Sequence, residues 1–550
     1  MKIAVSARSF GLTPLLLLLV PVLLSMTAAA SPTTAESGPE PGAVPLYDNL
    51  GDHHHAITTK VPKAQQYFDQ GLRLVYAFNH AEAIRAFQEA ARLDPDCAMC
   101  YWGIALAYGP NINAPMDAES GKQAYAALQQ ALALTPKASE RERAYIQALT
   151  HRYAPEPPAD RAKLDAAYAR AMKAVAAQYP DDLDAATLYG EALMDLQPWD
   201  YWTRDGEPYP ETTEILAQLE RVLEENPKHP GACHYYIHTV EAAHPELAIP
   251  CADRLAKLMP GAGHLVHMPA HIYIRVGRWD DAIESNVHAV HADETYIADQ
   301  RPGGIYPLAY YPHNYHFLSF AATMAGRSAE AIEAARAVVN QIPVEVARQV
   351  PELQPLAAYL HLTLVSFGRW DEVLAEPLPP PELQLTTGLV QYARGVALAA
   401  KGKGVEAEAA LDAVRGAAAA GAGVHKTVLE IAAHALAGEI ATRQGQLDTA
   451  ISHFQAAKAL EDGLRYMEPP HWYYPIRHSL GAVLLKAGRA AEAEAVYRED
   501  LKRFPANGWS LYGLAASLRA QGKAAEAEAV EEQFQRLWAK ADVTLTASRF

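Results

Sequence analysis

The chain has 550 residues, of which 50% are hydrophobic and 20% are charged, enough for a large buried core or several domains. Its formal net charge of −17, with no long basic run, argues against a nucleic-acid partner, because phosphate binding requires clustered lysine and arginine side chains.

The first 30 residues have the three parts of an export signal. Lys2 and Arg8 supply positive charge, residues 15–24 form a short apolar core, and an A-x-A pattern ending at Ala30 fits a cleavage site. The apolar core is too short for a comfortable membrane span, although a retained anchor is the alternative. We therefore expect removal of residues 1–30, a periplasmic or secreted mature protein, and no stable membrane span after cleavage.

Residues 31–60 are rich in proline, glycine, serine and threonine, and we expect a flexible arm or linker there. Three consecutive histidines, His53–His55, lie in this arm. We expect them to form a solvated, metal-scavenging tract. The alternative is that the arm folds back and adds ligands to a site elsewhere.

After residue 60 one pattern recurs, in which a turn is followed by a small residue inside a helical stretch. The small residue is alanine at positions 83, 282, 331, 407, 450, 493 and 527, and valine at position 373. A spacing of 34 residues separates positions 373 and 407, and again positions 493 and 527. This period, with Ala-rich helical stretches and no useful strand alternation, predicts stacked helix-turn-helix repeats.

The repeats resemble the tetratricopeptide repeat (TPR) family, as an exported bacterial-type member. The first repeat carries Gly71, Ala83, Phe87, Ala90 and Pro95 at the family's positions, and the last repeat carries Leu514, Ala515, Gly522 and Ala527. The last repeat departs from the family at Leu511, where the pattern prefers tryptophan. The resemblance covers most of residues 64–540, more weakly between 110 and 230. It implies an all-α TPR-like superhelix, an α-solenoid with a concave groove.

We divide the mature chain into four parts on this basis. The arm covers residues 31–60, the N-terminal and central repeats with a His-rich groove cover residues 61–345, the C-terminal repeats cover residues 346–540, and a tail covers residues 541–550. Three insertions rich in proline and glycine interrupt the period, at residues 109–121, 197–212 and 301–312. Such insertions often lie on the binding face of a repeat protein.

Cys97 and Cys100 form a CxxC motif followed by Tyr101. Covalent haem attachment requires a histidine at that next position, so we expect no c-type haem. The motif indicates either small buried residues or a local disulfide.

Histidines gather in three consecutive central repeats. On a helix of ~3.6 residues per turn, His234, His238 and Glu241 share one stripe, and a spacing of four residues between histidines is typical of metal ligands. In the TPR family the first helix of each repeat lines the groove, and the resemblance places two further histidine clusters there. The predicted metal ligands are His234, His238, Glu241, His267, His271, His313 and His316.

His264 shares this register, and Pro269 is expected to interrupt the helix between His267 and His271. Sets rich in histidine suit copper, iron or zinc. Hydrogen-bonded histidines between packed helices, or a polar surface that holds a peptide, remain the alternative. Farther along, residues 468–478 gather aromatic side chains with His471, Arg477 and His478, and we expect a peptide- or ligand-binding patch rather than metal ligands there.

Three functions follow from these patterns. The first is a metal-binding TPR protein, and in particular a metal-dependent oxidoreductase whose groove binds a small molecule or peptide. The second is a non-catalytic periplasmic scaffold that binds a peptide or partner protein. The third is a metal-dependent hydrolase or a metal carrier that uses the same residues.

Overall fold

The computed structural model describes residues 44–304 and 306–549, and the predicted export signal lies outside them. The described residues contain helices and two isolated β-bridges, at Asn111–Ala114 and Trp202–Pro208, but no strand. The all-α prediction is therefore confirmed. Across the described ranges, we find no helix long and apolar enough to cross a membrane.

The chain divides into two compact units. Unit 1 contains the described residues up to Asp48 together with Asp52–Thr239, and unit 2 contains Asn49–Gly51 and the chain from Val240 onward. The predicted division between residues 345 and 346 lies inside unit 2 and stays a prediction.

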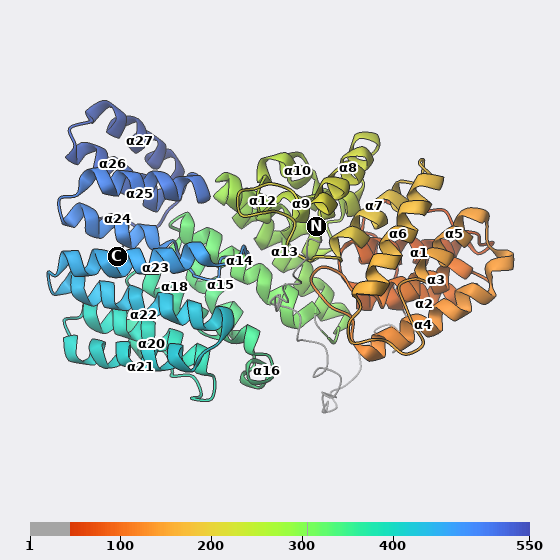
Figure 1. The fold of residues 1–550 in the computed structure, drawn as a ribbon, viewed down its shortest axis with the longest axis horizontal. Helices are drawn as coiled ribbons and strands as arrows, with labels where there is room; N and C mark the ends of the chain where they lie inside the picture. Colours follow the sequence, from red (N-terminus) through yellow and green to blue (C-terminus); the bar gives the residue numbers. More distant parts are fainter. Residues whose placement is uncertain (1–43, 305, 550) are drawn as a thin grey trace, which may run out of the picture. The chain divides into compact units, whose positions relative to one another are not determined.

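Unit 1 is a stack of helices in which neighbours along the chain pack against each other (Figure 1). Its α-helices are α1 (Pro62–Tyr76), α2 (His80–Leu93), α3 (Ala98–Ala107), α4 (Ala118–Ala133), α5 (Glu140–Leu149), α6 (Ala162–Gln178), α7 (Leu183–Met194), α8 (Pro210–Glu225) and α9 (Pro230–Val240), the last of which ends at the boundary between the units. A 3₁₀ turn, η2 (Thr135–Lys137), precedes α5.

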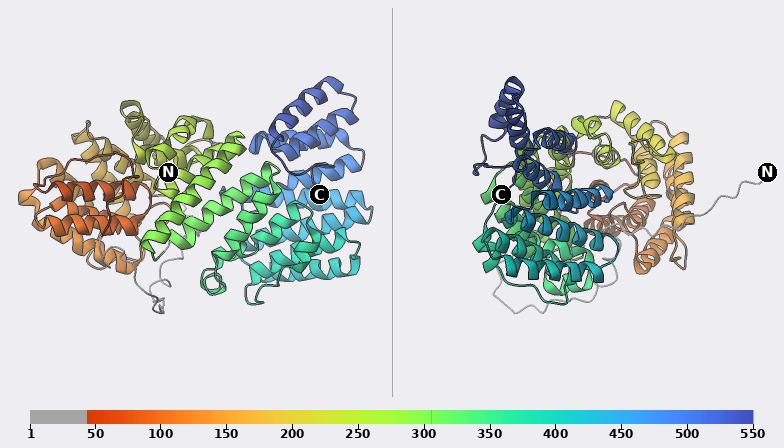
Figure 2. Two further views of the ribbon diagram at one scale, coloured as in Figure 1. Left: turned by 180° about the vertical axis from the view of Figure 1, so that it is seen from behind. Right: turned by 60° about the vertical axis from the view of Figure 1, so that its left-hand side comes forward.

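Unit 2 continues the same construction, and the two views of Figure 2 show its helices lying side by side. Its first half contains η3 (Pro245–Ala248), α10 (Ile249–Leu258), α11 (Gly263–His267), α12 (Pro269–Val276), α13 (Trp279–Gln300), the π-helical η4 (Tyr306–Tyr310), α14 (Tyr311–Met324), α15 (Ser328–Asn340), α16 (Val344–Gln349), η5 (Pro351–Leu353) and α17 (Gln354–Ala357). Its second half contains α18 (Tyr359–Ser366), α19 (Trp370–Ala375), α20 (Gln384–Ala400), α21 (Gly404–Ala420), α22 (Gly423–Arg443), α23 (Leu447–Gly463), α24 (Ile476–Lys486), α25 (Ala490–Arg503), α26 (Gly508–Ala520) and α27 (Ala524–Leu537).

Glycines opposite aromatic rings explain how closely the helices stack. Phe87 of α2 is fully buried, and a Cβ added to Gly71 of α1 or to Gly103 of α3 would lie 2.6 Å or 2.5 Å from its ring. Tyr497 fills the same role in unit 2, where Gly481 and Gly513 leave no room for a side chain beside its ring. Glycine at these four positions therefore makes space for a large ring between neighbouring helices.

The turns between paired helices also follow the sequence pattern. The glycine that opens each turn has a positive φ, at residues 277, 326, 368, 402, 445, 488 and 522. Glycine adopts this left-handed conformation without the steric penalty of a Cβ, which ends one helix and starts the next.

Candidate metal centre

The centre begins at a break between two short helices of unit 2. His267 is the last residue of α11, and Pro269 is the first residue of α12. A proline is well tolerated there because the first turn of a helix has no intrahelical acceptor for its missing N–H. Although the expected interruption is present, His267 and His271 still face each other, with their Nε2 atoms 2.8 Å apart.

The other nitrogen of His267 is fixed by Asn286 of α13. The side-chain amide of Asn286 donates from Nδ2 to the Ala282 carbonyl at 2.7 Å, which leaves its Oδ1 as an acceptor. This oxygen lies 2.7 Å from His267 Nδ1, so the His267 proton resides on Nδ1 and a lone pair on Nε2 points toward His271.

His271 Nδ1 faces two carboxylates. It lies 2.7 Å from Glu241 Oε2 and 3.1 Å from Glu468 Oε2, and all three side chains are at most 3% exposed. Burial alone would lower the pKa of His271, but the charges and hydrogen bonds of the two carboxylates raise it to about 9. Burial in turn raises the pKa of both glutamates against the opposing effect of His271.

A third imidazole completes the group. One ligand atom from each of His267, His271 and His313 lies within 4.8 Å of the others. The ring of Phe317, one turn after His313 on α14, lies 4.6 Å from the rings of His267 and His271. We call His267, His271 and His313 the imidazole group.

This geometry allows two occupants between His267 and His271. A proton on His271 Nε2 donates to His267, or a transition metal accepts both lone pairs. Metal–nitrogen bonds of about 2.0–2.1 Å in a tetrahedral site require ligand atoms about 3.3 Å apart, so a small outward movement of the rings accommodates an ion. Histidine ligands whose second nitrogen donates to a carboxylate or amide oxygen are typical of metal centres, because that hydrogen bond orients the ring.

Glu468, which is not among the predicted site residues, also contributes to this candidate centre. It lies on the connection between α23 and α24, next to Arg275. The Tyr466 hydroxyl donates to Glu468 Oε1, and the Arg275 guanidinium stacks 5.4 Å from the Tyr466 ring. Glu468 therefore lies beside a predicted ligand, while the expectation of a peptide- or ligand-binding patch at residues 468–478 stays a prediction. No local signal marks Glu468, since only the curvature of unit 2 brings it to His271.

Glu241 reaches the centre from just beyond the end of α9, not from the helical stripe that predicted it. His234 and His238 stay on α9 and belong to unit 1. Both are buried, His234 Nδ1 lies 2.7 Å from the Tyr76 carbonyl oxygen, and the Phe78 ring contacts both imidazoles.

Aromatic side chains contact His316, the remaining predicted ligand, and His264, which shares the predicted register. The His264 ring contacts the Tyr310 ring edge-on at 4.8 Å. His316 packs against Tyr359 at 4.3 Å, outside the imidazole group, and burial lowers its pKa to about 3.

Unit 1 contains a second cluster, which we call the arm clasp. His53 Nε2 and His229 Nε2 lie 2.9 Å and 3.1 Å from Asp184 Oδ1, and His55 Nδ1 lies 2.8 Å from Asp184 Oδ2. The Tyr76 hydroxyl donates to the same carboxylate at 2.6 Å. The His53 and His55 side chains are each 11% exposed, so the expectation of a solvated tract is wrong for both.

The arm clasp is closed by its own hydrogen bonds. The Ala232 N–H donates to His229 Nδ1 at 3.1 Å, which leaves the His229 proton on Nε2, pointing at Asp184. A nitrogen that carries a proton cannot ligate a metal, so His229 acts as a donor. Burial alone would raise the pKa of Asp184, but His53, His229 and His55 hold it well below its ordinary value.

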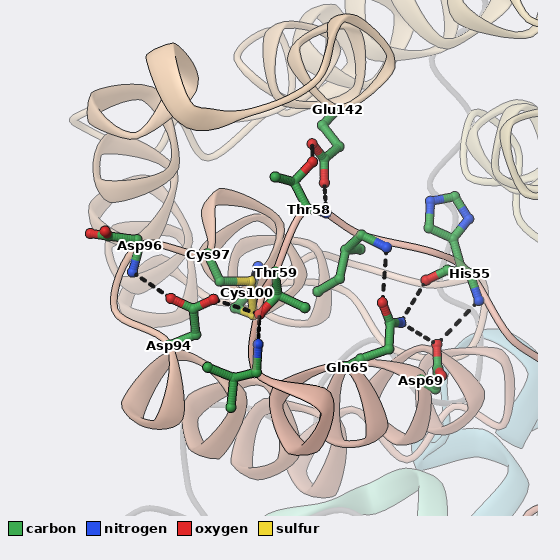
Figure 3. Close-up of a disulfide and its surroundings, with 12 residues drawn as sticks. His55, Thr58, Thr59, Gln65, Asp69, Asp94, Asp96, Cys97, Cys100 and Glu142 are labelled. Atoms are coloured by element: carbon green, nitrogen blue, oxygen red, sulfur yellow. Dashed lines mark hydrogen bonds between the residues drawn. A yellow bond between two sulfur atoms is a disulfide. The ribbon is translucent and has the colours of Figure 1, made fainter.

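Backbone and side-chain contacts hold the rest of the arm on unit 1 (Figure 3). The His55 N–H donates to Asp69 at 3.1 Å, and Thr58 donates to Glu142 from both its N–H and its hydroxyl at 2.5 Å. The Cys97–Cys100 pair at the start of α3 is a disulfide close to the same stretch of the arm, so the local-disulfide alternative for this motif is confirmed.

These contacts therefore hold residues 52–60 of the arm on the surface of unit 1. Two of the predicted insertions meet nearby, since Trp199 donates from Nε1 to the Ile112 carbonyl at 2.9 Å and stacks edge-on against His238. The insertion at residues 301–312 supplies Tyr306 and Tyr310 to unit 2.

Comparisons with known proteins bear on the fold. A tetratricopeptide repeat model matches residues 475–499 and 508–533, which confirms the resemblance in the C-terminal repeats. None of the curated proteins matches the chain. Among solved structures, human IFIT1 in its dimer with m7Gppp-AAAA is 14% identical, covering 88% of this chain and 92% of that chain with a TM-score of 0.31. Yeast Tom70 is 15% identical, covering 87% and 93% with a TM-score of 0.26. These structural likenesses are too distant to inform function.

Proposed function

We propose that this chain is an exported TPR protein that binds a transition metal through His267, His271 and His313. Glu241, Glu468 and Asn286 orient two of these imidazoles without ligating the ion. The chemistry of the donor set favours copper, iron or zinc. The Cys97–Cys100 disulfide supports an oxidising compartment and so supports export.

One observation carries the proposal. The Nε2 atoms of His267 and His271 face each other while each Nδ1 lies on an oxygen acceptor. A proton on His271 Nε2 satisfies this pair, and a transition metal shared by both Nε2 atoms satisfies it equally; the third imidazole, His313, whose ligand atom lies within 4.8 Å of theirs, favours the metal.

The test is the metal content of the mature protein from residue 31, without a His tag, measured by elemental mass spectrometry. We expect near-stoichiometric metal in the wild-type protein and its loss in His267→Ala and His271→Ala. His316→Ala is the matched control, because this residue lies one turn from His313 on α14 yet outside the imidazole group. The control should keep its metal.

Two outcomes would overturn the proposal. One is wild-type protein without metal both as isolated and after incubation with zinc, copper or iron salts. The other is equal loss in His316→Ala and His271→Ala, which would show that the metal is held elsewhere or nonspecifically.

Three imidazoles leave a fourth coordination position for water or substrate, which is the arrangement of catalytic rather than structural zinc sites. We therefore infer metal-dependent turnover, oxidative with copper or iron and hydrolytic with zinc. Turnover that depends on the added metal and is lost in His271→Ala distinguishes this function from that of a metal carrier.

The TPR match in the C-terminal repeats favours a second role as a scaffold for a partner protein or peptide. This role uses a different part of unit 2, so both functions are compatible in one chain.

A further inference from the structure

The segment after α27 returns along unit 2 without regular secondary structure and bends at residues 542 and 546–548; we call residues 541–549 the tail segment. The Asp542 carboxylate accepts the N–H groups of Ser328 and Ala329, at 2.6 Å and 2.9 Å, where α15 begins. The Asp542 N–H donates to the Gly326 carbonyl at 3.1 Å. A carboxylate at a helix N-terminus is favourable, so the start of the tail segment is anchored.

The end of the tail segment is buried against the C-terminal repeats. Ser548 and Arg549 are 2% and 6% exposed. The Ser548 hydroxyl donates to the His478 carbonyl at 2.9 Å and lies 2.5 Å from the Tyr497 hydroxyl. These two partners hold a hydroxyl side chain at a buried position.

Arg549 lies in an aromatic surrounding. Its guanidinium carbon is 3.7 Å from the centre of the Tyr474 ring, and Nη2 donates to the Tyr473 hydroxyl at 3.1 Å. Glu439, which is 6% exposed, supplies a nearby carboxylate whose pKa is raised by burial and lowered by the Arg549 charge. A desolvated arginine is stable only with such compensation, so these residues form a specific arginine site.

We propose that the surface formed by Tyr473, Tyr474, Tyr497 and Glu439 is a binding site for a peptide segment with a small hydroxyl residue followed by arginine. In this chain the tail segment occupies the site, and a partner peptide of the same chemistry competes with it. The surface lies within and beside the repeats that match the TPR model. The proposal does not depend on the metal centre, and it gives the scaffold role a defined class of ligand.

Isothermal titration calorimetry tests the proposal, with a chain ending at residue 540 and a synthetic peptide of residues 541–549. We expect this shortened chain to bind the peptide and the full chain to bind it at least tenfold more weakly, because its own tail segment competes. A peptide with Arg549→Ala should bind at least tenfold more weakly. A peptide with Thr546→Ala, at an exposed position, is the matched control and should bind unchanged.

The proposal is wrong if the folded, shortened chain does not bind the peptide, if the Arg549→Ala peptide binds as tightly as the parent, or if the full chain binds as tightly as the shortened one. Circular dichroism checks folding. If the shortened chain does not fold, a full chain with Ser548→Ala and Arg549→Ala replaces it, with the same expectations. Metal content is measured on the same samples, so failure of this proposal is separate from failure of the metal proposal.

Discussion

The arm clasp and the imidazole group are both buried clusters of histidine and acid, yet they support opposite conclusions. In the arm clasp, three imidazoles point at one carboxylate, Asp184, and His229 receives a backbone N–H on its other nitrogen. In unit 2, His267 and His271 turn their outer nitrogens to oxygen acceptors and point their inner nitrogens at each other. The first cluster is complete without an ion.

The difference shows that proximity alone does not identify a metal centre. Ligand atoms within 4.8 Å of one another occur in both clusters. The partner of the second imidazole nitrogen separates His229 from His267. The Ala232 N–H puts the His229 proton on the inward nitrogen, while the Asn286 oxygen puts the His267 proton on the outward nitrogen and leaves a lone pair on the inward one. This comparison gives four measurable expectations, from the largest effect to the smallest.

Replacing the Asp184 carboxylate of the arm clasp should have the largest effect, which is a loss of stability where the arm is held on unit 1. Asp184→Asn leaves His53, His55 and His229 without their charged partner in a buried site, and breaking such a pair costs about 3–5 kcal/mol. In the Asp184→Asn variant, we expect proteases to cleave within residues 52–60 at a lower denaturant concentration than in the wild-type protein. Asp181→Asn, whose carboxylate is 70% exposed, is the control and should change nothing measurable. Unchanged protection in Asp184→Asn would mean that the clasp does not hold the arm.

Replacing the carboxylates beside His271 should weaken metal binding without abolishing it. Residues that orient a metal-bound histidine typically contribute about 10–100-fold to affinity, and we expect that loss in Glu468→Gln and Glu241→Gln. Competition with a chromogenic chelator measures it. Glu492→Gln, at an exposed ion pair on α25, should bind metal like the wild type. Wild-type affinity in both variants would contradict the assigned role.

Two buried aspartates should give opposite pH dependences of stability. The pKa of Asp184 is held well below 3.8, so its contribution is present above the unfolded-state value and is lost as the pH falls. Burial raises the pKa of Asp293 to about 7, since only the Tyr306 hydroxyl and the Asn314 amide compensate it. Its contribution is therefore largest below 3.8 and is lost as the pH rises toward 7.

Unfolding midpoints between about pH 3 and pH 8 check these signs, because stability follows the difference in bound protons between the two states. Asp184→Asn should reduce the loss of stability in acid, and Asp293→Asn should reduce the loss between pH 4 and pH 7. Parallel shifts in both variants would show that the surroundings of the two carboxyls do not differ as described.

The smallest effect concerns the repeats outside both clusters. Gly416 lies inside α21 with nothing within 4 Å of an added Cβ, so Gly416→Ala should stabilise the chain by about 0.5–1 kcal/mol. Gly103→Ala should act in the opposite direction, by about 1–3 kcal/mol, because its Cβ would press on Phe87. Thermal unfolding measures the stability change in each variant. Changes of the same sign in Gly416→Ala and Gly103→Ala would contradict the packing described.

Local chemistry explains which parts of the fold could be predicted from sequence. A glycine, a turn and an alanine recur because each pair of helices needs them, so the pattern located the repeats without any long-range information. The pairing of His267 with His271 was also predictable, because both lie within two turns of chain. A local disulfide between Cys97 and Cys100 was one of the two alternatives predicted, since these residues are also close in the chain.

The parts of the site that could not be predicted depend on contacts between residues that lie far apart in the sequence. Glu468 lies several repeats from His271 in sequence, and no spacing rule connects them. His55 looks solvent-exposed in a polar arm until Asp184 is known to lie opposite. His316 shares a groove register with His267, but Tyr359 of a later helix covers it. In each case the decisive neighbour is distant in the chain.

The reach of Glu468 to His271 also has a consequence for biosynthesis. A ribosome releases His271 long before Glu468, and closing such a long loop carries an entropic cost until the intervening helices have folded. The second carboxylate thus arrives only after the helices between α12 and Glu468 have assembled. Chains that end before Glu468 hold an incomplete centre, so the full affinity expected of the proposed metal site requires unit 2 to be made and folded as far as Glu468.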